Sequence, residues 1–347
     1  MEYSQFFEES GAPFTGRKQK KLREFLASMQ LRYDEGIEYT VNMVTPEGEI
    51  AATGSLQNNV LKCIAVDDRF QGMGLSSRVV TLLMNRAMEE GHSHLFVFTK
   101  PKNIAMFSDL GFYPIIKTED VLFMENARDG IIKYVRSLER PTEQKKNIGA
   151  IVANCNPFTN GHRYLIETAA AQCEVLHLFV LSEDRSAFPA EARYRLVKEG
   201  IASIGADNII LHKTSDYLIS SAVFPTYFIK EEKRAEQINC ELDLRIFAEY
   251  FAKELGITKR FVGTEPFCPV TSAYNREMKA ILSQYGIEVV EIERKKQDEL
   301  AISASRVREC MARGDYREIE KMVPPSTMRY LLSPQGKEIA KSLAEKQ

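Results

Sequence analysis

The stretch Ile148–Arg163 reads IGAIVANCNPFTNGHR, and its pattern decides how the second half of the chain folds. It begins as a short apolar run, which is typical of a buried strand. A turn that contains Gly161 follows, and helical spacing then places Leu165, Ile166 and Ala169 on one face. Because the first N–H groups of a helix have no partner inside it, a strand, a glycine turn and a helix in this order favour a bound phosphate group.

Further apolar runs follow this first strand and alternate with helical stretches. They lie at residues 175–181, 208–212, 260–263 and 288–292. Strands that alternate with helices predict βαβ units, so we expect an α/β Rossmann-like parallel-sheet domain over residues 148–347, completed by C-terminal helices. Such sheets bind ligands at the carboxyl ends of their strands, so motifs placed there are well positioned for chemistry.

The first 138 residues follow another pattern, in which hairpins and helices mix. Helical spacing covers residues 18–31, 75–90 and 103–110, and strands are expected at 38–45, 49–56, 60–66, 95–99, 112–116 and 121–124. This order predicts an antiparallel α+β domain over residues 1–138. Residues 139–147 are polar and charged, contain Pro141 and show no apolar periodicity, so we expect a linker there.

The composition excludes several classes of protein. The chain has 347 residues, 44% hydrophobic and 27% charged, which excludes a disordered chain, a collagen-like repeat or a small disulfide scaffold. The formal net charge of -2 disfavours a general nucleic-acid binder. We find neither an apolar run long enough to span a bilayer nor a signal-peptide pattern, so we expect a cytoplasmic protein without a membrane partner. The six cysteines are scattered, and we expect no metal site built from protein ligands.

The first domain contains a second glycine turn, RFQGMGL at residues 69–75, directly after the strand expected at 60–66. Its spacing, R-x-x-G-x-G, resembles the acetyl-CoA loop of GNAT-type N-acetyltransferases. The resemblance implies a GNAT-like fold and a CoA-like ligand whose pyrophosphate meets the start of the next helix. The residues that it assigns to this ligand are Arg69, Gln71, Gly72 and Gly74.

A later segment strengthens this resemblance and also departs from it. Asn103, Ala105 and the Gly111-Phe112 pair resemble the family's N…A…GF pattern. The family often has a tyrosine four residues before that glycine, acting as general acid, but this chain has Phe107. Phenylalanine has no proton to give, so we expect a domain that binds a CoA-like group without transferring an acetyl group itself.

The turn of the second domain resembles a nucleotide-processing motif. Residues 159–162, TNGH, resemble the T/H-x-G-H motif of nucleotidyltransferases, which cleave ATP between its α- and β-phosphates. The second motif of that superfamily, I-S-x-T/S-x-[IV]-R, is matched by ISASRVR at residues 302–308. The resemblance implies catalytic roles for three residues, in which His162 and Thr159 donate to phosphate oxygens and Arg308 holds the β- and γ-phosphates.

The ATP-binding residues follow from these two motifs and from the loop after the strand expected at 260–263. They are Asn156, Phe158, Thr159, Gly161, His162, Gly263, Thr264, Glu265, Ile302, Ser303, Ser305, Arg306 and Arg308. A less specific expectation, from position after the strand at 175–181, is that Asp184, Arg185 and Arg193 line the substrate side.

Longer segments narrow the family further. Residues 154–163 and 262–275, together with the GNAT-like first domain, resemble the [citrate (pro-3S)-lyase] ligases over nearly the whole chain. That resemblance implies that ATP and acetate form acetyl-adenylate, with Mg²⁺ held mostly by phosphates and water. The acetyl group then passes to the thiol of a phosphoribosyl-dephospho-CoA arm on the acyl-carrier (gamma) subunit of citrate lyase. The loop at residues 69–74 is then expected to grip this arm.

Three other interpretations remain open. An acetyl-carrier ligase of malonate decarboxylase would use the same adenylation chemistry. The motifs distinguish it poorly from a citrate lyase ligase. A coenzyme-biosynthesis nucleotidyltransferase would use a phosphorylated substrate in place of acetate. An N-acetyltransferase fused to a regulatory nucleotide-binding domain is the third, and Phe107 counts against it.

Overall fold

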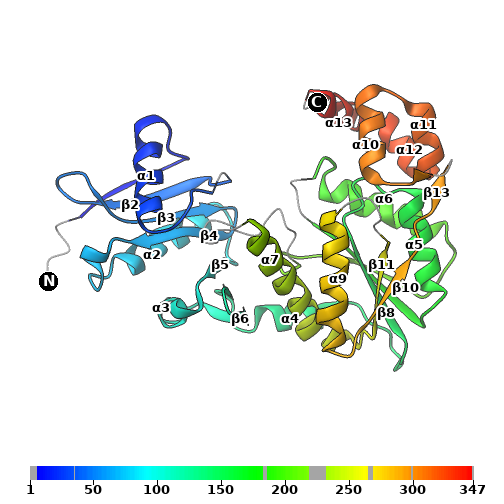
Figure 1. The fold of residues 1–347 in the computed structure, drawn as a ribbon, viewed down its shortest axis with the longest axis horizontal. Helices are drawn as coiled ribbons and strands as arrows, with labels where there is room; N and C mark the ends of the chain where they lie inside the picture. Colours follow the sequence, from blue (N-terminus) through cyan, green and yellow to red (C-terminus); the bar gives the residue numbers. More distant parts are fainter. Residues whose placement is uncertain are drawn as a thin grey trace. The chain divides into compact units, whose positions relative to one another are not determined.

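The computed structural model describes residues 6–34, 36–182, 186–218, 232–264, 269–297 and 300–345. The chain divides into two compact units, which Figure 1 shows in sequence colours. The first unit contains Met1–Ile131 and Phe224–Leu242, and the second contains Ile132–Val223 and Asp243–Gln347. Residues 139–147 form neither helix nor strand and are grouped with the second unit. The linker role of this segment stays a prediction.

A seven-stranded sheet forms the first unit, in the order β1-β2-β3-β4-β5-β7-β6. Its elements are β1 (Phe7–Gly11), α1 (Gly16–Ser28), β2 (Tyr39–Val44), β3 (Ile50–Gln57), β4 (Val60–Val66), α2 (Leu75–Glu89), β5 (Phe96–Thr99), α3 (Ile104–Asp109), β6 (Tyr113–Lys117) and β7 (Leu122–Glu125). The predicted helices and hairpins are confirmed within a few residues. The short strand β1 was not predicted, nor was α4 (Gly130–Ser137), which follows this unit along the chain.

The expectation of a wholly antiparallel sheet is wrong at one place. Strands β4 and β5 run parallel and pair Val60 with Phe96 and Leu61 with Val97. The chain between them forms α2, and a helical crossover of this length returns the next strand in the same direction. Strand β4 continues past Leu61, which pairs with Val97, as far as Val66. Because β4 and β5 run parallel, the sheet is mixed.

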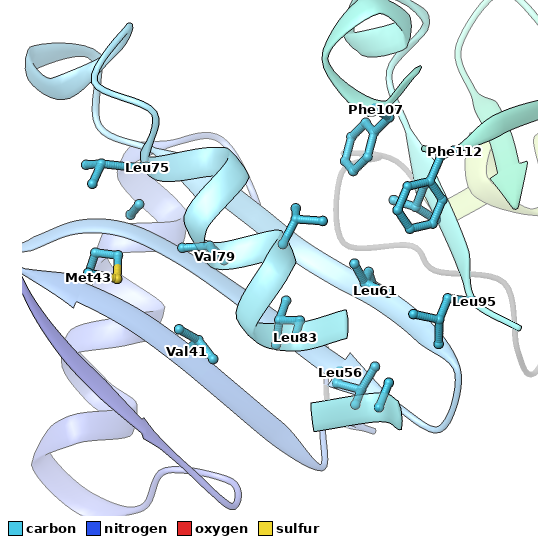
Figure 2. Packing of buried hydrophobic residues seen from close by; sticks show 14 of the residues in the cluster. Val41, Met43, Leu56, Leu61, Leu75, Val79, Leu83, Leu95, Phe107 and Phe112 are labelled. Atoms are coloured by element: carbon cyan, nitrogen blue, oxygen red, sulfur yellow. The ribbon is translucent and has the colours of Figure 1, made fainter. Parts of the chain in front are cut away.

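Helix α2 covers one face of this sheet, as Figure 2 shows. Its buried residues Val79 and Leu83 pack in one cluster with Val41 and Leu61 of the strands. Gly54 permits the close approach, because a Cβ there would lie 2.6 Å from Val79 Cγ1. Burying each such side chain contributes roughly 1.5–3 kcal/mol, so this interface fixes α2 and the loop that precedes it.

A five-stranded parallel sheet forms the second unit, in the order β10-β9-β8-β11-β12. The strands are β8 (Ile148–Ala153), β9 (Val175–Val180), β10 (Ile209–Lys213), β11 (Lys259–Gly263) and β12 (Glu288–Ile292). This confirms the predicted α/β Rossmann-like domain. The chain proceeds from β8 outward to β10 and then returns to β11 on the other side of β8. The carboxyl ends of β8 and β11 therefore flank the switch point at which such sheets bind ligands.

Helices surround the second sheet and lead out of it. They are α5 (Asn160–Ala170), α6 (Ala190–Ala202) and α9 (Pro269–Ser283). Helix α7 (Glu232–Ile246) belongs to the first unit up to Leu242, and it continues in the second unit as a short π-helix (Phe247–Ala252) and α8 (Lys253–Leu255). A short hairpin of β13 (Lys296–Gln297) and β14 (Leu300–Ala301) precedes the last four helices. These are α10 (Ala304–Arg313), α11 (Tyr316–Met322), α12 (Pro325–Leu332) and α13 (Pro334–Ala344).

Two glycines of the second unit lie directly against aromatic rings of its core. A Cβ at Gly149 on β8 would lie 2.5 Å from the Phe261 ring, and one at Gly200 on α6 would lie 2.1 Å from the Phe158 ring. Both glycines therefore allow an aromatic side chain to lie against the backbone. A search of the described helices finds none that is long and apolar enough to cross a membrane.

Candidate functional site

The start of α5 is fixed by a reciprocal pair of hydrogen bonds. Thr159 is the N-cap, and its hydroxyl oxygen accepts from the His162 backbone N–H at 3.3 Å. In return, the Thr159 backbone N–H donates to Nδ1 of the His162 ring at 3.1 Å. This is a capping box in which histidine stands where glutamate or glutamine is usual. The Thr159 side chain is buried and lies 2.9 Å from the same Nδ1, so its position sets the orientation of the ring.

These contacts also decide the protonation state of His162. Because Nδ1 accepts from a backbone N–H, it carries the lone pair, and in the neutral ring the proton sits on Nε2. Burial, together with the positive charge of Arg294, lowers the pKa of His162 to about 4. The ring is therefore neutral near pH 7 and presents one N–H donor at the helix start.

The two sequence motifs meet at this helix start. A Cβ on Gly161 would lie 3.0 Å from the carbonyl oxygen of Ile302, so only glycine lets the turn rest against the second motif without a shift. Arg308 Nη1 donates to the Asn156 carbonyl oxygen at 2.5 Å, across 152 positions of sequence. Burial lowers the pKa of Arg308, yet arginine remains protonated at neutral pH. Four predicted residues, Asn156, Gly161, Ile302 and Arg308, thus come together.

The hydroxyls of the second motif take part in its own local structure. Ser303 is the N-cap of α10, and its Oγ accepts from the Arg306 backbone N–H at 3.1 Å. The Ser305 hydroxyl accepts from Arg308 Nη2 at 3.1 Å, which orients that guanidinium. Arg306 points to Glu318 of α11 and forms an ion pair with it. The structure therefore ties Arg306 to the C-terminal helices, while Ser303, Ser305 and Arg308 lie with the first motif.

The carboxyl end of β11 adds Gly263, Thr264 and one residue that sequence reasoning missed. The backbone of Thr264 bonds to Ile292 at the end of β12, and the Thr264 carbonyl accepts from Arg294 Nε at 2.7 Å. The Arg294 side chain also lies along Gly263. Arg294 lies two residues after β12, at the same edge of the sheet as Gly263. Its contacts with Thr264 and Gly263 place it at the carboxyl end of β11, and its charge contributes to the lowered pKa of His162.

The other predicted residues of the second unit either pack within its core or lie outside the described residues. The Phe158 ring is fully buried against Gly200 and stacks beside His162 with ring centroids 6.0 Å apart. Arg193 is fully buried and donates to the carbonyl oxygen of Asn154 after β8 and to those of Leu181 and Phe188 after β9. It therefore joins the loops that follow two strands. The remaining predicted residues, Glu265, Asp184 and Arg185, lie outside the described residues.

The described part of the chain contains no group of three or more histidine, cysteine or acidic residues placed to hold a metal ion. The polar side chains of the two motifs that the structure describes are, besides His162, amides, hydroxyls and guanidinium groups. Such donors fit the oxygens of a polyphosphate, because arginine and N–H groups bind phosphate directly. A divalent ion at this site would take its ligands mainly from the phosphates and from water.

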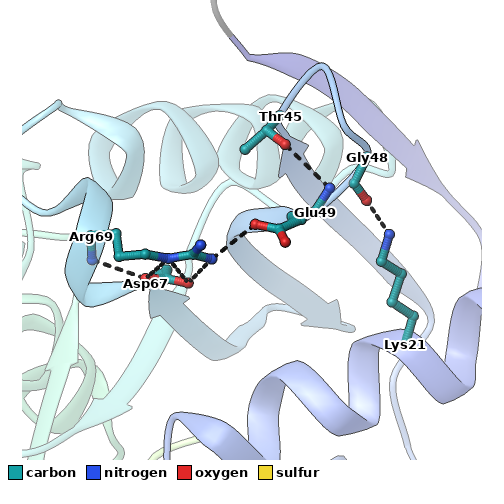
Figure 3. Close-up of polar contacts among 6 residues, drawn as sticks. All are labelled: Lys21, Thr45, Gly48, Glu49, Asp67 and Arg69. Atoms are coloured by element: carbon teal, nitrogen blue, oxygen red, sulfur yellow. Dashed lines mark hydrogen bonds and ion pairs between the residues drawn. The ribbon is translucent and has the colours of Figure 1, made fainter.

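The glycine turn of the first unit has the expected backbone but different side-chain contacts. Gly72 and Gly74 both have positive φ, and Gly74 is the N-cap of α2. The Arg69 guanidinium pairs with two carboxylates, Asp67 at 2.8 Å and Glu49 at 3.1 Å, as drawn in Figure 3. These contacts raise the pKa of Arg69 and lower that of Asp67. The charge of Arg69 is thus compensated within the protein.

Two further positions of this unit are informative. Gln71 donates its side-chain amide to Asp68, so both predicted side-chain donors of the loop have carboxylate partners within the first unit. Phe107, at the place of the family's frequent tyrosine, is 1% exposed and packs edge-on against Phe112 at 5.9 Å between ring centroids. This position belongs to the core here.

Comparison with known proteins identifies the family. The family model described as the citrate lyase ligase C-terminal domain matches residues 148–331, and the acetyltransferase (GNAT) family model matches residues 4–112. The [citrate [pro-3S]-lyase] ligase of Klebsiella pneumoniae is 43% identical over 91% of this chain and 93% of its own length. This chain belongs to the citrate lyase ligase family.

Two more relatives agree with this assignment. The [citrate [pro-3S]-lyase] ligase of Escherichia coli is 42% identical over 91% of this chain and 90% of its own length. The corresponding protein of Haemophilus influenzae is 40% identical over 90% of this chain and 96% of its own length. As a member of the citrate lyase ligase family the chain is a ligase, and its GNAT-like and Rossmann-like parts are confirmed.

Proposed function

We propose that this ligase acetylates the thiol of a phosphoribosyl-dephospho-CoA arm on the acyl-carrier subunit of citrate lyase. The reaction consumes ATP and acetate and releases AMP and pyrophosphate. Support comes from the family of the chain and from the relatives, whose names state citrate lyase as their target. The single observation that carries the first chemical step is the contact between the two nucleotide motifs, in which Arg308 donates to Asn156 and Gly161 lies against Ile302.

The first step forms acetyl-adenylate. An acetate oxygen attacks the α-phosphorus of ATP, and the bond from that phosphorus to the bridging oxygen breaks, which releases pyrophosphate. The carboxylate is itself the nucleophile, so the step needs neither a protein nucleophile nor a proton transfer. It needs donors that meet the charge as it builds on the phosphate oxygens. The neutral His162, with its proton on Nε2, is such a donor at any pH well above 4.

The other residues of the site divide into those that touch ATP and those that position them. Arg308 and Arg294 supply positive charge for the β- and γ-phosphates, assisted by the hydroxyls of Ser303 and Ser305. Thr159 acts as a positioning residue, because its backbone N–H and hydroxyl both engage His162 Nδ1. Mg²⁺ would take its ligands mainly from the phosphates and from water, and it would supply neutralisation of the phosphate charge.

The second step transfers the acetyl group. The thiol of the arm loses its proton, its sulfur bonds to the acyl carbon, and AMP leaves with the electrons of the acyl–oxygen bond. The first unit contributes by binding the arm at residues 69–74. Because Arg69 and Gln71 are engaged with carboxylates, the backbone N–H groups around Gly72 and Gly74 are the donors that we assign to the pyrophosphate of the arm.

ATP–pyrophosphate exchange tests the first step. The purified ligase should exchange pyrophosphate into ATP when acetate is present and should do so much more slowly without it. Exchange that ignores acetate would overturn the proposal. Exchange that requires a phosphorylated substrate instead would indicate a coenzyme-biosynthesis enzyme, and acetyl-CoA consumption without ATP would indicate an N-acetyltransferase.

Acetylation of a purified carrier tests the second step. The thiol of the citrate lyase carrier should become acetylated, as followed by mass spectrometry, and the carrier of malonate decarboxylase serves as the comparison. Preference for the second carrier would move the assignment to malonate decarboxylase. Gly72→Val, at a position with φ of +79°, should weaken use of the carrier and spare the exchange. Loss of exchange in the folded variant would overturn the role given to this loop.

A further inference from the structure

Cys155 lies between β8 and the turn before α5, and its backbone is strained. Its φ of +50° falls in the left-handed region, which residues other than glycine rarely adopt. The residue is 1% exposed, so this part of the backbone belongs to the core. A strained conformation of this kind persists only where surrounding contacts hold it. Because Cys155 directly precedes Asn156, whose carbonyl accepts from Arg308, the contacts that hold Cys155 bear on the nucleotide site.

Arg193 on α6 holds the residue before Cys155. Its Nη1 donates to the Asn154 carbonyl oxygen at 3.0 Å and also to the side-chain oxygen of Asn154. The same nitrogen donates to the Leu181 carbonyl oxygen at 2.6 Å, and Nε donates to the Phe188 carbonyl oxygen at 3.0 Å. One fully buried guanidinium thus fixes Asn154 to the segment that follows β9.

The residue after Cys155 is held from the same segment. The Phe188 backbone N–H donates to the side-chain oxygen of Asn156 at 3.0 Å. The carbonyl of this same Phe188 accepts from Arg193, so Phe188 connects the two. Both neighbours of Cys155 are therefore held through Arg193, Asn154 directly and Asn156 by way of Phe188.

The shape of its side chain suits arginine to this place. A guanidinium carries five N–H donors in a rigid plane and keeps its charge at neutral pH, so one group can meet several carbonyl oxygens at once. A lysine ammonium is a point charge on a flexible stem, and it does not span the carbonyls of Asn154 and Phe188 in the same way. Because unpaired carbonyl oxygens in a core are costly, loss of the guanidinium should let the chain around Cys155 rearrange. The Asn156 carbonyl would then turn away from Arg308.

We propose that Arg193 is a positioning residue of the adenylation step. By holding both neighbours of Cys155, it sets the direction of the Asn156 carbonyl, and that carbonyl orients the guanidinium of Arg308. The Arg193 side chain is fully buried, so it acts through these residues without touching ATP. The assignment rests on the proposed function, in which Arg308 holds the β- and γ-phosphates. It gives Arg193 a role behind the site in place of one along the substrate side.

A double-mutant cycle between Arg193 and Arg308 tests the proposal. The measured quantities are kcat/KM for ATP in acetate-dependent ATP–pyrophosphate exchange and, without acetate, the Kd of ATP with Mg²⁺ by calorimetry. Arg193→Lys should lower kcat/KM about tenfold, and Arg308→Gln should lower it about a hundredfold. Because Arg193 acts through Arg308, the double variant should stay within about twofold of Arg308→Gln alone. The Kd should follow the same pattern.

Two further variants distinguish positioning from general stability. Asn154→Ala removes the side-chain acceptor of Arg193 and should lower kcat/KM about threefold, again without adding to the effect of Arg308→Gln. Lys198→Gln removes a positive charge at an exposed position of the same helix and should leave kcat/KM and Kd unchanged. A residue that serves stability alone would lower the Tm and the fraction of active enzyme, and its effect would multiply that of Arg308→Gln.

The possible results separate this inference from the proposed function. Arg193→Lys with the kcat/KM of wild type would overturn the inference, and so would effects that multiply in the folded double variant. If Arg193→Lys does not fold, the cycle between Asn154→Ala and Arg308→Gln decides in the same way. Wild type that binds ATP but shows no acetate-dependent exchange would contradict the proposed function, and the cycle in Kd would still decide the role of Arg193.

Discussion

The two glycine turns of this ligase share a local pattern and differ in what surrounds them. In both, a strand ends, a glycine turn follows and a helix begins, at Gly74 before α2 and at Thr159 before α5. In the first unit the nearest arginine, Arg69, is held by two carboxylates on an exposed loop. In the second unit the turn contacts residues about 140 positions later, and Arg308 reaches back to the Asn156 carbonyl.

The difference shows that the backbone geometry of a glycine turn does not by itself determine which side chains surround it. A glycine turn at a helix start supplies N–H groups wherever it occurs. Reaction chemistry needs a further set of donors held in place by contacts from elsewhere in the chain, and among the described residues such contacts surround the turn of the second unit. This contrast matches the proposal that the first turn holds a ligand and the second takes part in the reaction. The predictions below test this contrast, from the largest expected effect to the smallest.

His162→Ala should produce the largest loss. Removing one preorganised donor to a developing oxyanion lowers kcat by roughly 10²- to 10³-fold. The measurement is the kcat of acetate-dependent ATP–pyrophosphate exchange. His92→Ala, in a turn of the first unit, is the control and should leave the exchange unchanged. A His162→Ala variant that retains more than a tenth of the wild-type rate would contradict the role of this residue.

Arg294→Gln should have the next largest effect, because it removes a positive charge that acts on the site. We expect exchange to slow by about tenfold or more. The pKa of His162 should rise in the same variant, since a nearby positive charge disfavours the protonated ring. NMR titration of the His162 ring measures this shift. Lys295→Gln, which removes a charge at the neighbouring exposed residue, is the control. An unchanged His162 titration would separate Arg294 from the site.

Mild acid should destabilise the second unit through its histidines. Burial lowers the pKa of His162, His177 and His212 to about 4 in the folded chain, against 6.5 for the ordinary group. The unfolded chain therefore binds protons first as pH falls from 6.5 to about 4, and stability is lost across that window. Each histidine contributes up to about 1.4 kcal/mol per pH unit. Denaturant unfolding at pH 7 and pH 5 measures the slope, which should be shallower in His162→Gln. An equal slope in that variant would rule out a contribution from His162.

Arg69→Gln should have the smallest effect. Its guanidinium is already compensated by Asp67 and Glu49 in exposed ion pairs, which contribute only about 0–1 kcal/mol each. We expect less than about a threefold change in KM for the carrier. A much larger rise, with exchange unchanged, would indicate that Arg69 leaves its carboxylates to bind the arm, and the contrast between the two turns would then be weaker.

The local patterns in the sequence predicted most of the fold. The strand at β4 was predicted with its observed bounds, and β8 was predicted together with the turn and helix that follow it. These elements follow from apolar periodicity, which local sequence displays directly. The wrong prediction was the direction of pairing between β4 and β5. Neither strand shows this direction in its own sequence, because the crossover helix between the two strands decides it.

The residues of the candidate site stay predictions that rest on short motifs. Gly161, His162 and Arg308 were selected because their types and spacing are characteristic. Arg294 was not selected because nothing in its immediate neighbourhood marks it, and only the fold places it beside Thr264, just after β11. The carboxylate partners of Arg306 and Arg69 also could not be predicted from the motifs. An arginine in a motif can bind a carboxylate as well as a phosphate, because both groups accept its N–H donors.

The bond between Arg308 and Asn156 has a consequence for synthesis of the protein. A chain growing from its N-terminus can form the sheet strand β8 and the turn at His162 long before α10 exists. The guanidinium that donates to the Asn156 carbonyl belongs to a residue that is synthesised 152 positions later. The proposed nucleotide site is therefore completed late in synthesis, and a chain truncated before α10 should show no acetate-dependent ATP–pyrophosphate exchange.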